Sequence, residues 1–170
     1  MPLHRALLNA MERLPGRWKA QVLLTTFGLT RIRLLALVRP VVEEYDEHRC
    51  VVRIPLNWLT RNHLKSMYFG VLATGADLAG GLAGFEEMFR LGNQVTGVFQ
   101  DVQAEFLRRA HGDVRFTCSE LASVRGLVRR AMESGERERM PVHVKATVRE
   151  HGEEVEVARF VLTLSVRRRR

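Results

Sequence analysis

The sequence has few of the residues from which metal centres, disulfide frameworks and nucleic-acid surfaces are usually built. Its two cysteines, Cys50 and Cys118, form no CxxC pair, and its six histidines are scattered along the chain. We therefore expect no metal site, no disulfide framework and a reduced, cytoplasmic environment. Aromatic residues make up only 7% of the chain, and the basic segments lack the interleaved aromatic residues that stack on bases. No nucleic-acid partner is expected on this ground.

The short motifs of several large enzyme classes are also missing. The sequence contains no P-loop, no GxSxG nucleophile elbow and no GxGxxG dinucleotide fingerprint. The apolar run at residues 22–29 is too short for a membrane span, and Arg31 and Arg33 follow it directly. We therefore expect no transmembrane segment and no bound cofactor, and the function must be sought in another pattern.

What the sequence does contain is enough apolar material for one folded domain. Hydrophobic residues make up 46% and charged residues 27% of the 170 residues. The formal net charge of +8 favours an anionic partner, such as nucleic acid, acidic lipid or a phosphate-bearing small molecule. Residues 167–170 are all arginine, and we interpret them as a solvated basic tail. An adaptor that binds a membrane surface or nucleic acid through the basic first segment and this tail is one alternative function.

The hydrophobic pattern predicts a helical first segment followed by a strand-rich domain. We treat residues 1–32 as an N-terminal helical arm, with helices over 3–14 and 18–27, residues 33–166 as the main domain and residues 167–170 as the basic tail. The main domain is expected to contain, in order, a hairpin at 38–56, a loop at 57–62, a helix over 66–89, strands at 98–106 and 113–119, a helix over 120–134 and strands at 140–148 and 155–166.

Several local signals refine this order of elements. Ser119 is a plausible N-cap for the second helix of the domain, and Gly135 is a plausible stop. In the last strand the alternation changes phase, which predicts a bulge near Val157 or Ala158. The helix at 66–89 begins with a stretch that has almost no polar face, so it must be buried on all sides. The whole pattern predicts an α+β fold in which a curved antiparallel sheet of about six strands wraps a long central helix.

Asp77 is the one charged residue in the apolar stretch of residues 66–85. A membrane-spanning helix is one interpretation, but five glycines and a central charge oppose it. A structural core helix whose carboxylate is merely satisfied by hydrogen bonds is the second. The third is a buried helix with a functional carboxylate, because an uncompensated buried charge is costly and such groups concentrate at functional sites.

Residues 62–77, which read NHLKSMYFGVLATGAD, resemble the hot-dog fold thioesterase superfamily. They look most like the branch, similar to phenylacetate-pathway thioesterases, whose motif has an asparagine, then His-Gly-Gly, then an aspartate in the central helix. Asn62 matches the motif asparagine, residues 68–70 (Tyr-Phe-Gly) occupy the His-Gly-Gly places, and Asp77 matches the catalytic acid. The order of elements over residues 33–166 also resembles an uncharacterised bacterial hot-dog family. The resemblance implies a hot-dog fold and an acyl-CoA thioesterase.

The resemblance also implies a role for each matched residue. Asp77 would act as general base toward water or as nucleophile, and Asn62 would orient the loop or the substrate. The backbone N–H groups of Phe69 and Gly70, at the start of the helix, would stabilise the oxyanion. Tyr68 stands where the motif has histidine and can still donate a hydrogen bond.

The substrate implied by the resemblance is a CoA thioester, bound at a cleft between subunits of a homodimer or a dimer of dimers. Its phosphates would suit a basic rim, for which the candidates are Arg125, Arg129, Arg130, Arg137 and Arg139. Because Tyr-Phe-Gly replaces His-Gly-Gly, a protein that binds acyl-CoA or an acyl chain without turnover is the second alternative function.

Overall fold

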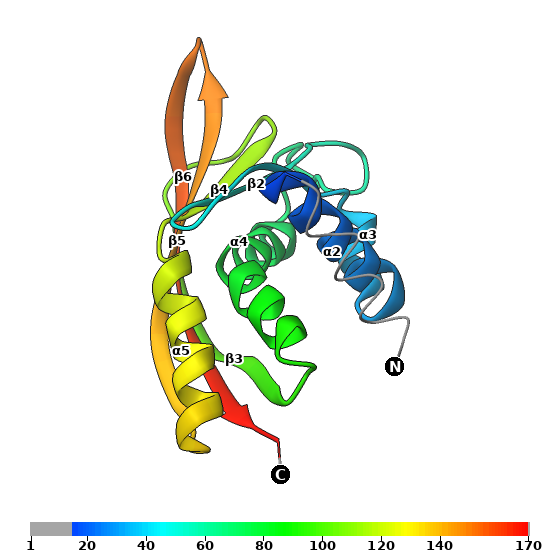
Figure 1. Cartoon of the computed structure of the whole chain (residues 1–170). Coiled ribbons are helices and arrows are strands. Elements are labelled where there is room, and N and C mark those ends of the chain that lie inside the picture. The colour runs from blue at the N-terminus through cyan, green and yellow to red at the C-terminus, as the bar shows by residue number, and fades with distance from the viewer. Residues whose placement is uncertain (1–14, 170) are drawn as a thin grey trace.

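The computed structural model describes residues 15–169 and consists of an antiparallel sheet that wraps one long helix, α4 (Phe69–Arg90) (Figure 1). The strands are paired in the order β1-β2-β4-β5-β6-β3, and every neighbouring pair is antiparallel. The expected α+β fold, with about six strands around a central helix, is confirmed. The strands are β1 (Val41–Tyr45), β2 (Cys50–Ile54), β3 (Val95–Phe106), β4 (Val114–Cys118), β5 (Glu138–Glu150) and β6 (Glu153–Arg168).

The sheet curves where the two longest strands change register. Ala146 of β5 pairs with Ala158 of β6, but the next residue, Thr147, pairs with Glu156, so that Val157 has no opposite residue. This is the bulge that the change of phase in the sequence predicts. An extra residue in one strand bends that strand and increases its twist, which helps the sheet to close around α4.

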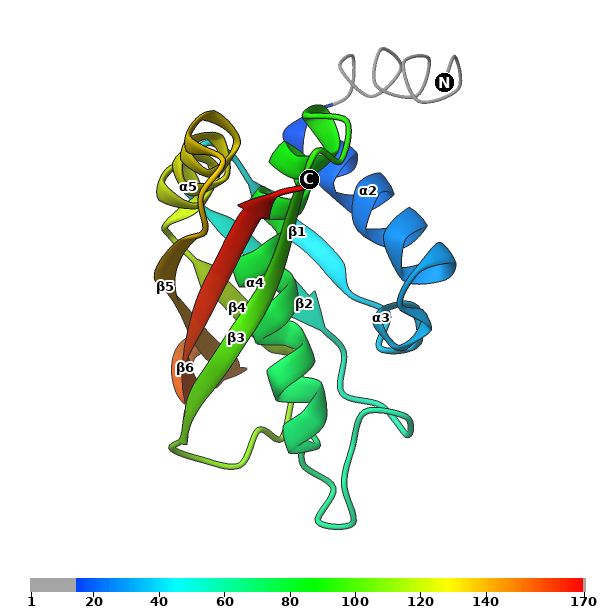
Figure 2. The ribbon, with the colours of Figure 1, turned by 90° about the horizontal axis from the view of Figure 1, so that it is seen from below.

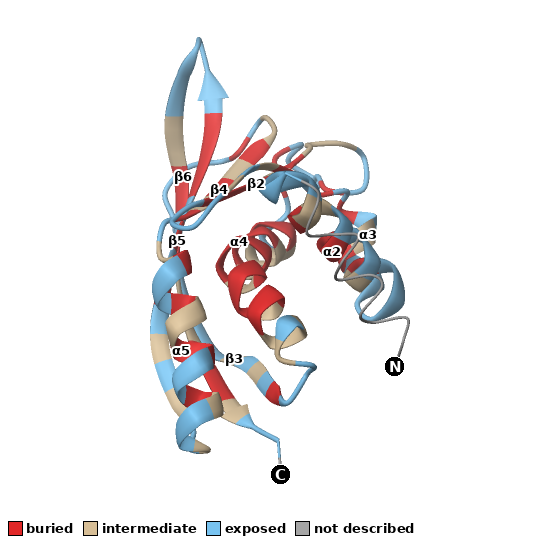
Figure 3. Ribbon diagram, viewed as in Figure 1, coloured by how far each residue is buried: buried red, intermediate tan, exposed pale blue. Residues whose placement is uncertain are grey.

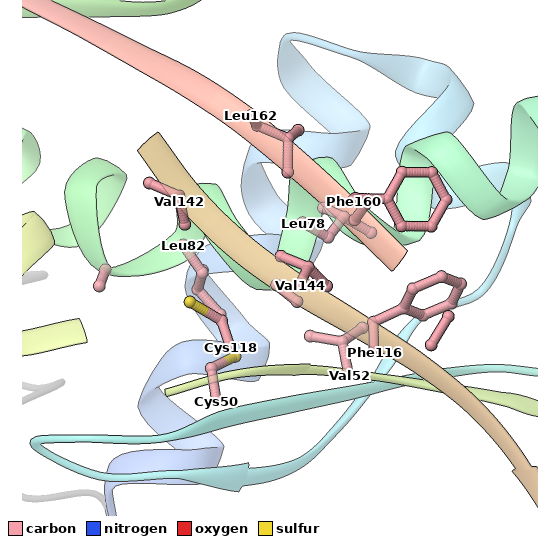
Figure 4. Packing of buried hydrophobic residues seen from close by; sticks show 14 of the residues in the cluster. Cys50, Val52, Leu78, Leu82, Phe116, Cys118, Val142, Val144, Phe160 and Leu162 are labelled. Carbon is pink, nitrogen blue, oxygen red and sulfur yellow. The ribbon is translucent and has the colours of Figure 1, made fainter. Parts of the chain in front are cut away.

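Helix α4 is buried along most of its length, as Figure 3 shows. Its small residues let the sheet come close: a Cβ at Gly75 would lie 2.2 Å from the Phe116 ring of β4. Leu78 and Leu82 of the helix lie among core side chains of β4, β5 and β6 (Figure 4). Within residues 15–169 no helix has the length and apolar character needed to cross a membrane. The packing of α4 in the core of the sheet contradicts its interpretation as a membrane-spanning helix.

The N-terminal arm packs against the domain. Helix α2 (Gly16–Thr30) runs past the expected end at Phe27, and a short helix, α3 (Arg33–Leu37), follows where we expected no element (Figure 2). The Phe27 ring lies 4.1 Å from the Phe85 ring of α4, centroid to centroid. The side chain of Gln21 accepts a hydrogen bond from the Val42 amide at 2.7 Å. The first helix expected, over residues 3–14, lies outside the described residues.

Two local expectations, one about the start of the second helix of the domain and one about the basic C-terminal residues, need correction. Helix α5 (Leu121–Ser134) begins after Glu120, so Ser119 is not its N-cap, while Gly135 ends it in the left-handed conformation as predicted. Glu120 accepts a hydrogen bond from the His143 amide instead of capping the helix with its side chain. Arg167 and Arg168 are part of β6, and the Arg169 amide donates to the Gln94 carbonyl at 2.7 Å. The basic segment is therefore largely held by the sheet.

Candidate active site

Asp77 lies near the middle of α4, half-buried, on the wall of a cavity of about 190 Å³. Among the described residues 15–169, no group donates a hydrogen bond to its carboxylate or forms an ion pair with it. Burial raises the pKa of Asp77 to about 6, and within the described part of the chain no cation counteracts this effect. A carboxylate with a pKa close to neutrality is able to accept a proton, which suits a general base.

The wall of the Asp77 cavity is otherwise apolar, and four parts of the fold contribute to it. Helix α4 lines it from Asp77 toward the C-terminal end of the helix, and β3, Leu164 of β6 and the N-terminal segment supply the other residues. A Cβ at Gly81 would lie 4.0 Å from Asp77 Oδ1 and 3.3 Å from the Phe99 ring, so this glycine leaves room beside the carboxylate. The lining residues are Leu24, Phe27, Ile32, Leu35, Asp77, Leu78, Gly81, Leu82, Phe85, Met88, Gly97, Val98, Phe99 and Leu164.

The start of α4 presents two free amide donors. Tyr68 precedes the helix in an extended conformation and its carbonyl accepts from the amides of Val71 and Leu72. In the described part of the chain no carbonyl accepts a hydrogen bond from the Phe69 or Gly70 amide. The first N–H groups of a helix lack partners within it, and the helix dipole adds positive potential there. These donors suit an anionic oxygen.

The side chains at the helix start shape access to these amides. Phe69 is 60% exposed and Tyr68 is 47% exposed, and their ring centroids lie 4.7 Å apart. A Cβ at Gly70 would lie 2.7 Å from the Tyr68 ring, so that ring covers Gly70. Packing therefore favours glycine at position 70 in this chain, because a side chain there would collide with the Tyr68 ring.

The two halves of the expected site are not adjacent within one chain. Phe69 and Asp77 are eight residues apart on one helix, which corresponds to about 12 Å along its axis. A reacting carbonyl needs an oxyanion donor within about 3 Å and a reacting atom within about 3.5 Å. Neither Phe69 nor Gly70 lines the cavity at Asp77. One chain thus provides the donors and the carboxylate on separate surfaces.

Asn62 holds the loop that leads into α4. Its side-chain oxygen accepts from the amides of Leu64 and Ser66 at 2.9 and 3.2 Å, and its side-chain nitrogen donates to Ser66 Oγ at 3.1 Å. Lys65, within this turn, has a positive φ of 59°. These bonds account for an asparagine at this position through the loop conformation alone.

The arginines expected to bind phosphate lie away from the Asp77 cavity. Arg125 donates to the Tyr45 hydroxyl and to Glu86, and Arg129 donates to Glu87 at 2.8 Å. Arg137 donates to Ser165 Oγ at 2.9 Å, Arg130 lies 3.8 Å from Glu138, and Arg139 is exposed on β5. None of the five lines the cavity at Asp77.

Sequence reasoning missed the contribution of the arm to the site. Phe27, Ile32 and Leu35 come from segments that we assigned to the arm or to the first residues of the domain, yet they line the Asp77 cavity. A second cavity, of about 560 Å³, adjoins the first and is lined in part by Arg31 and Arg169. The apolar spacing of residues 24–35 was the available signal, but it does not reveal which surface the arm covers.

The sheet, the buried α4 and the carboxylate on that helix together define a hot-dog fold with a candidate site on its central helix. Residues 25–166 match the family model described as Domain of unknown function (DUF4442), and the chain belongs to that family. No curated protein matches the chain.

Solved structures confirm the hot-dog fold. A Chlorobaculum tepidum protein of unknown function matches with a TM-score of 0.74 at 14% identity, over 91% of this chain and 98% of that one. A Pseudomonas aeruginosa protein of unknown function, described as a probable thioesterase, matches with a TM-score of 0.68 at 24% identity, over 92% and 97%. A Silicibacter pomeroyi thioesterase family protein matches with a TM-score of 0.62 at 16% identity, over 88% and 98%. At these identities the likeness concerns the fold.

Proposed function

We propose that this protein hydrolyses an acyl-CoA thioester and that Asp77 carries the reaction. The observation that carries the proposal is the Asp77 carboxylate, which lies on the wall of an apolar cavity, has no hydrogen-bond or ion-pair partner within residues 15–169, and has its pKa raised to about 6 by burial. The free energy cost of an uncompensated carboxylate in such a place argues for a chemical role over a structural one. The thioesterase descriptions of structures with the same fold support this reaction class.

In the proposed reaction Asp77 removes a proton from water while the water oxygen attacks the thioester carbon. The C–S bond then breaks, and the proton is returned to the leaving thiolate. Alternatively Asp77 attacks the carbonyl carbon directly, the C–S bond breaks to release the CoA thiolate, and an anhydride forms. Water then hydrolyses the anhydride to the free acid and Asp77, and the proton released is balanced by the one that the thiolate takes up. In both routes the carbonyl oxygen becomes negative, and the amides of Phe69 and Gly70 are the donors that we assign to it. This assignment follows the His-Gly-Gly branch of the superfamily.

A second copy of the chain brings these two halves together in the proposal. The 12 Å of helix that separate Phe69 from Asp77, about 1.5 Å per residue, argue that each site combines the carboxylate of one chain with the helix start of another. The strand β3 lies at an edge of the sheet and exposes Val98, Val102 and Phe106. An exposed apolar edge strand favours pairing with another strand. We therefore propose a homodimer, with a dimer of dimers as the larger alternative.

CoA enters the proposal as part of the substrate, and the reaction requires no bound cofactor. The α5 arginines that we expected at the CoA phosphates are engaged with Glu86 and Glu87, so we assign no side chain to the phosphates. A cytoplasmic location, where acyl-CoA is available, completes the proposal.

A panel of acyl-CoA substrates tests the proposed reaction. The wild type should release CoA, and Asp77→Asn and Asp77→Ala should each lower kcat by about 10²–10⁴-fold, the usual contribution of a general base. Phe69→Pro removes one amide donor at a helix position where proline is tolerated, and it should lower kcat by about 10²–10³-fold. If no thioester is cleaved, or if both Asp77 variants keep full activity, the proposal is wrong.

Binding without turnover is the alternative outcome of the same experiment. The Tyr68 ring packed over Gly70 is the observation that favours it, because this ring narrows access to the amide donors. Tight binding of acyl-CoA by the wild type with no release of CoA would establish this alternative. Binding to anionic vesicles or to RNA that is lost at high salt would instead support the adaptor function.

A further inference from the structure

One face of α4 extends from the Asp77 carboxylate to a pair of aromatic rings, Phe27 and Phe85. Asp77, Gly81 and Phe85 are spaced four residues apart and therefore lie above one another on the helix surface. All three line the smaller cavity, which Phe27 of the arm enters from the opposite side. Apart from Asp77, the described residues that line this cavity are uncharged. The cavity is thus an apolar channel with the reacting group at one end.

The Phe27 and Phe85 rings separate this channel from the larger cavity of about 560 Å³. Phe27, Phe85, Met88 and Gly97 line both cavities, so the first three side chains and the Gly97 backbone lie between them as a partition. The Phe27 and Phe85 rings are in contact, with 4.1 Å between their centroids, and Met88 packs over Gly97, where a Cβ would lie 3.2 Å from the Met88 sulfur. The larger cavity beyond the partition has a polar rim that includes Arg31, Asn93 and Arg169.

We propose that the Phe27–Phe85 pair is the chain-length stop of the site, and that the substrate carries an uncharged aliphatic acyl chain that ends against these two rings. This inference rests on the proposed thioesterase function and names its substrate class. The volume sets the length: an apolar cavity of about 150 Å³ accommodates benzene, so about 190 Å³ holds roughly six to eight carbons. The arm is then a part of the substrate site, because one of the two rings belongs to α2.

The attachment of the arm supports a fixed stop over a mobile one. Gln21 binds the backbone of residues 40 and 42 through both ends of its side-chain amide. Lys19 forms an ion pair with the buried Glu86 of α4 at 3.1 Å. Gly28 packs against Ala36, where a Cβ would lie 3.1 Å from the Ala36 amide nitrogen. These contacts hold Phe27 in one position relative to α4.

The test compares kcat/KM for straight-chain acyl-CoAs of 4 to about 16 carbons. The wild type should be fastest at roughly six to eight carbons. Phe27→Ala and Phe85→Ala open the partition, so each should move the optimum to longer chains, with a gain of about fourfold per additional methylene that becomes buried. Phe27→Leu should move the optimum less than Phe27→Ala. The matched control is Val22→Ala, since Val22 lies on the same helix and lines only the larger cavity.

Two results separate the failure of this inference from that of the proposed function. If the wild type cleaves thioesters but the variants retain its chain-length profile, while circular dichroism confirms that they are folded, the length stop is wrong and the thioesterase function stands. If no thioester is cleaved, the thioesterase function is wrong. In that case, calorimetry measures binding of the same acyl-CoA series to Asp77→Asn and to the double variant Asp77→Asn/Phe27→Ala. If the double variant prefers longer acyl chains than Asp77→Asn, the inference is supported. If the two variants have the same chain-length preference, or if neither binds, the inference is wrong.

Discussion

At the residue scale, Asp77 lowers the stability of the fold, while in the proposed function it supplies the reacting group. A carboxylate that is partly buried without a partner lowers the free energy of unfolding at neutral pH, and the raised pKa of about 6 is the measure of that cost. The surrounding residues do not relieve it, because they are apolar. Natural sequences retain such a conflict between local and global preference mainly at functional positions.

Asp77→Asn should therefore stabilise the fold at pH 7 by about 1–3 kcal/mol, whereas the proposed function requires it to lower kcat by about 10²–10⁴-fold. The folded-state pKa of Asp77 lies above the unfolded value of 3.8, so the native state binds the additional proton between about pH 4 and 6. In that window the stability of the wild type falls as pH rises. The advantage of Asp77→Asn should accordingly vanish near pH 4, which thermal melting at pH 4 and pH 7 measures. An equal or lower Tm for Asp77→Asn at pH 7 would contradict the burial argument.

Two glycines of α4 should respond differently to the same substitution. Gly75→Ala places a Cβ 2.2 Å from the Phe116 ring and should destabilise the protein by about 1–3 kcal/mol or more. Gly81→Ala places a Cβ 3.3 Å from Phe99, and the gain in helix propensity of about 1 kcal/mol offsets the small adjustment of that ring. Urea denaturation of the two variants checks this contrast. Comparable losses for both would show that Gly81 has a structural role.

At the element scale, the C-terminal turns of α4 depend on a buried ion-pair network. Tyr45 donates a hydrogen bond to Glu86 at 2.5 Å, and Lys19, Arg90 and Arg125 surround the same carboxylate. Although desolvation acts in the opposite direction, hydrogen bonds from Tyr45 and Lys19 lower the pKa of Glu86. This network joins the arm, β1, α4 and α5 through one side chain. Arg125 is therefore a structural residue in this chain.

Arg125→Ala should lower the free energy of unfolding by about 1–3 kcal/mol, because it removes one of the three cations around the buried Glu86 carboxylate. Arg125 is 15% exposed and Glu86 8% exposed at the side chain, so solvent screens the pair only weakly. Arg159→Ala, which breaks an exposed ion pair with Glu156, is the control and should change stability little. Chemical denaturation measures both. If the two variants lose the same amount, the network is not an important part of the stability.

Most elements of the sheet, as well as the central helix, could be predicted from the sequence, because alternation and apolar content are local signals. The bulge at Val157 was visible as a change of phase for the same reason. The position of the arm, the short helix α3 and the burial of Glu86 depend on contacts between residues far apart in the chain. In the same way, Val98 and Phe106 alternate as if they faced a core, but both are more than half exposed, because alternation does not show which part of a sheet face another element covers.

At the scale of the whole molecule, a site that uses both Asp77 and the start of α4 has to bridge about 12 Å of helix. A monomer exposes both the apolar edge of β3 and the free amides of α4. In a two-fold symmetric dimer every contact occurs twice, so each dimer would contain two equivalent composite sites. Whether Asp77 acts with the helix start of its own chain or of the other is then open to a direct test.

Mixing two inactive variants provides that test. Asp77→Asn lacks the carboxylate, and Phe69→Pro lacks the amide donor. If each site uses two chains, a mixed dimer contains one site with both groups intact, and a random mixture should recover about one quarter of the wild-type activity. If each site uses one chain, every site in the mixture is defective and the activity stays at the sum of the separate variants. The mixture must be unfolded and refolded together, so that subunits exchange.

Sedimentation velocity of the wild type and of Val102→Lys, which places a charge on the exposed edge of β3, shows whether that edge forms the dimer. A Val102→Lys protein that remains dimeric would place the contact on another surface.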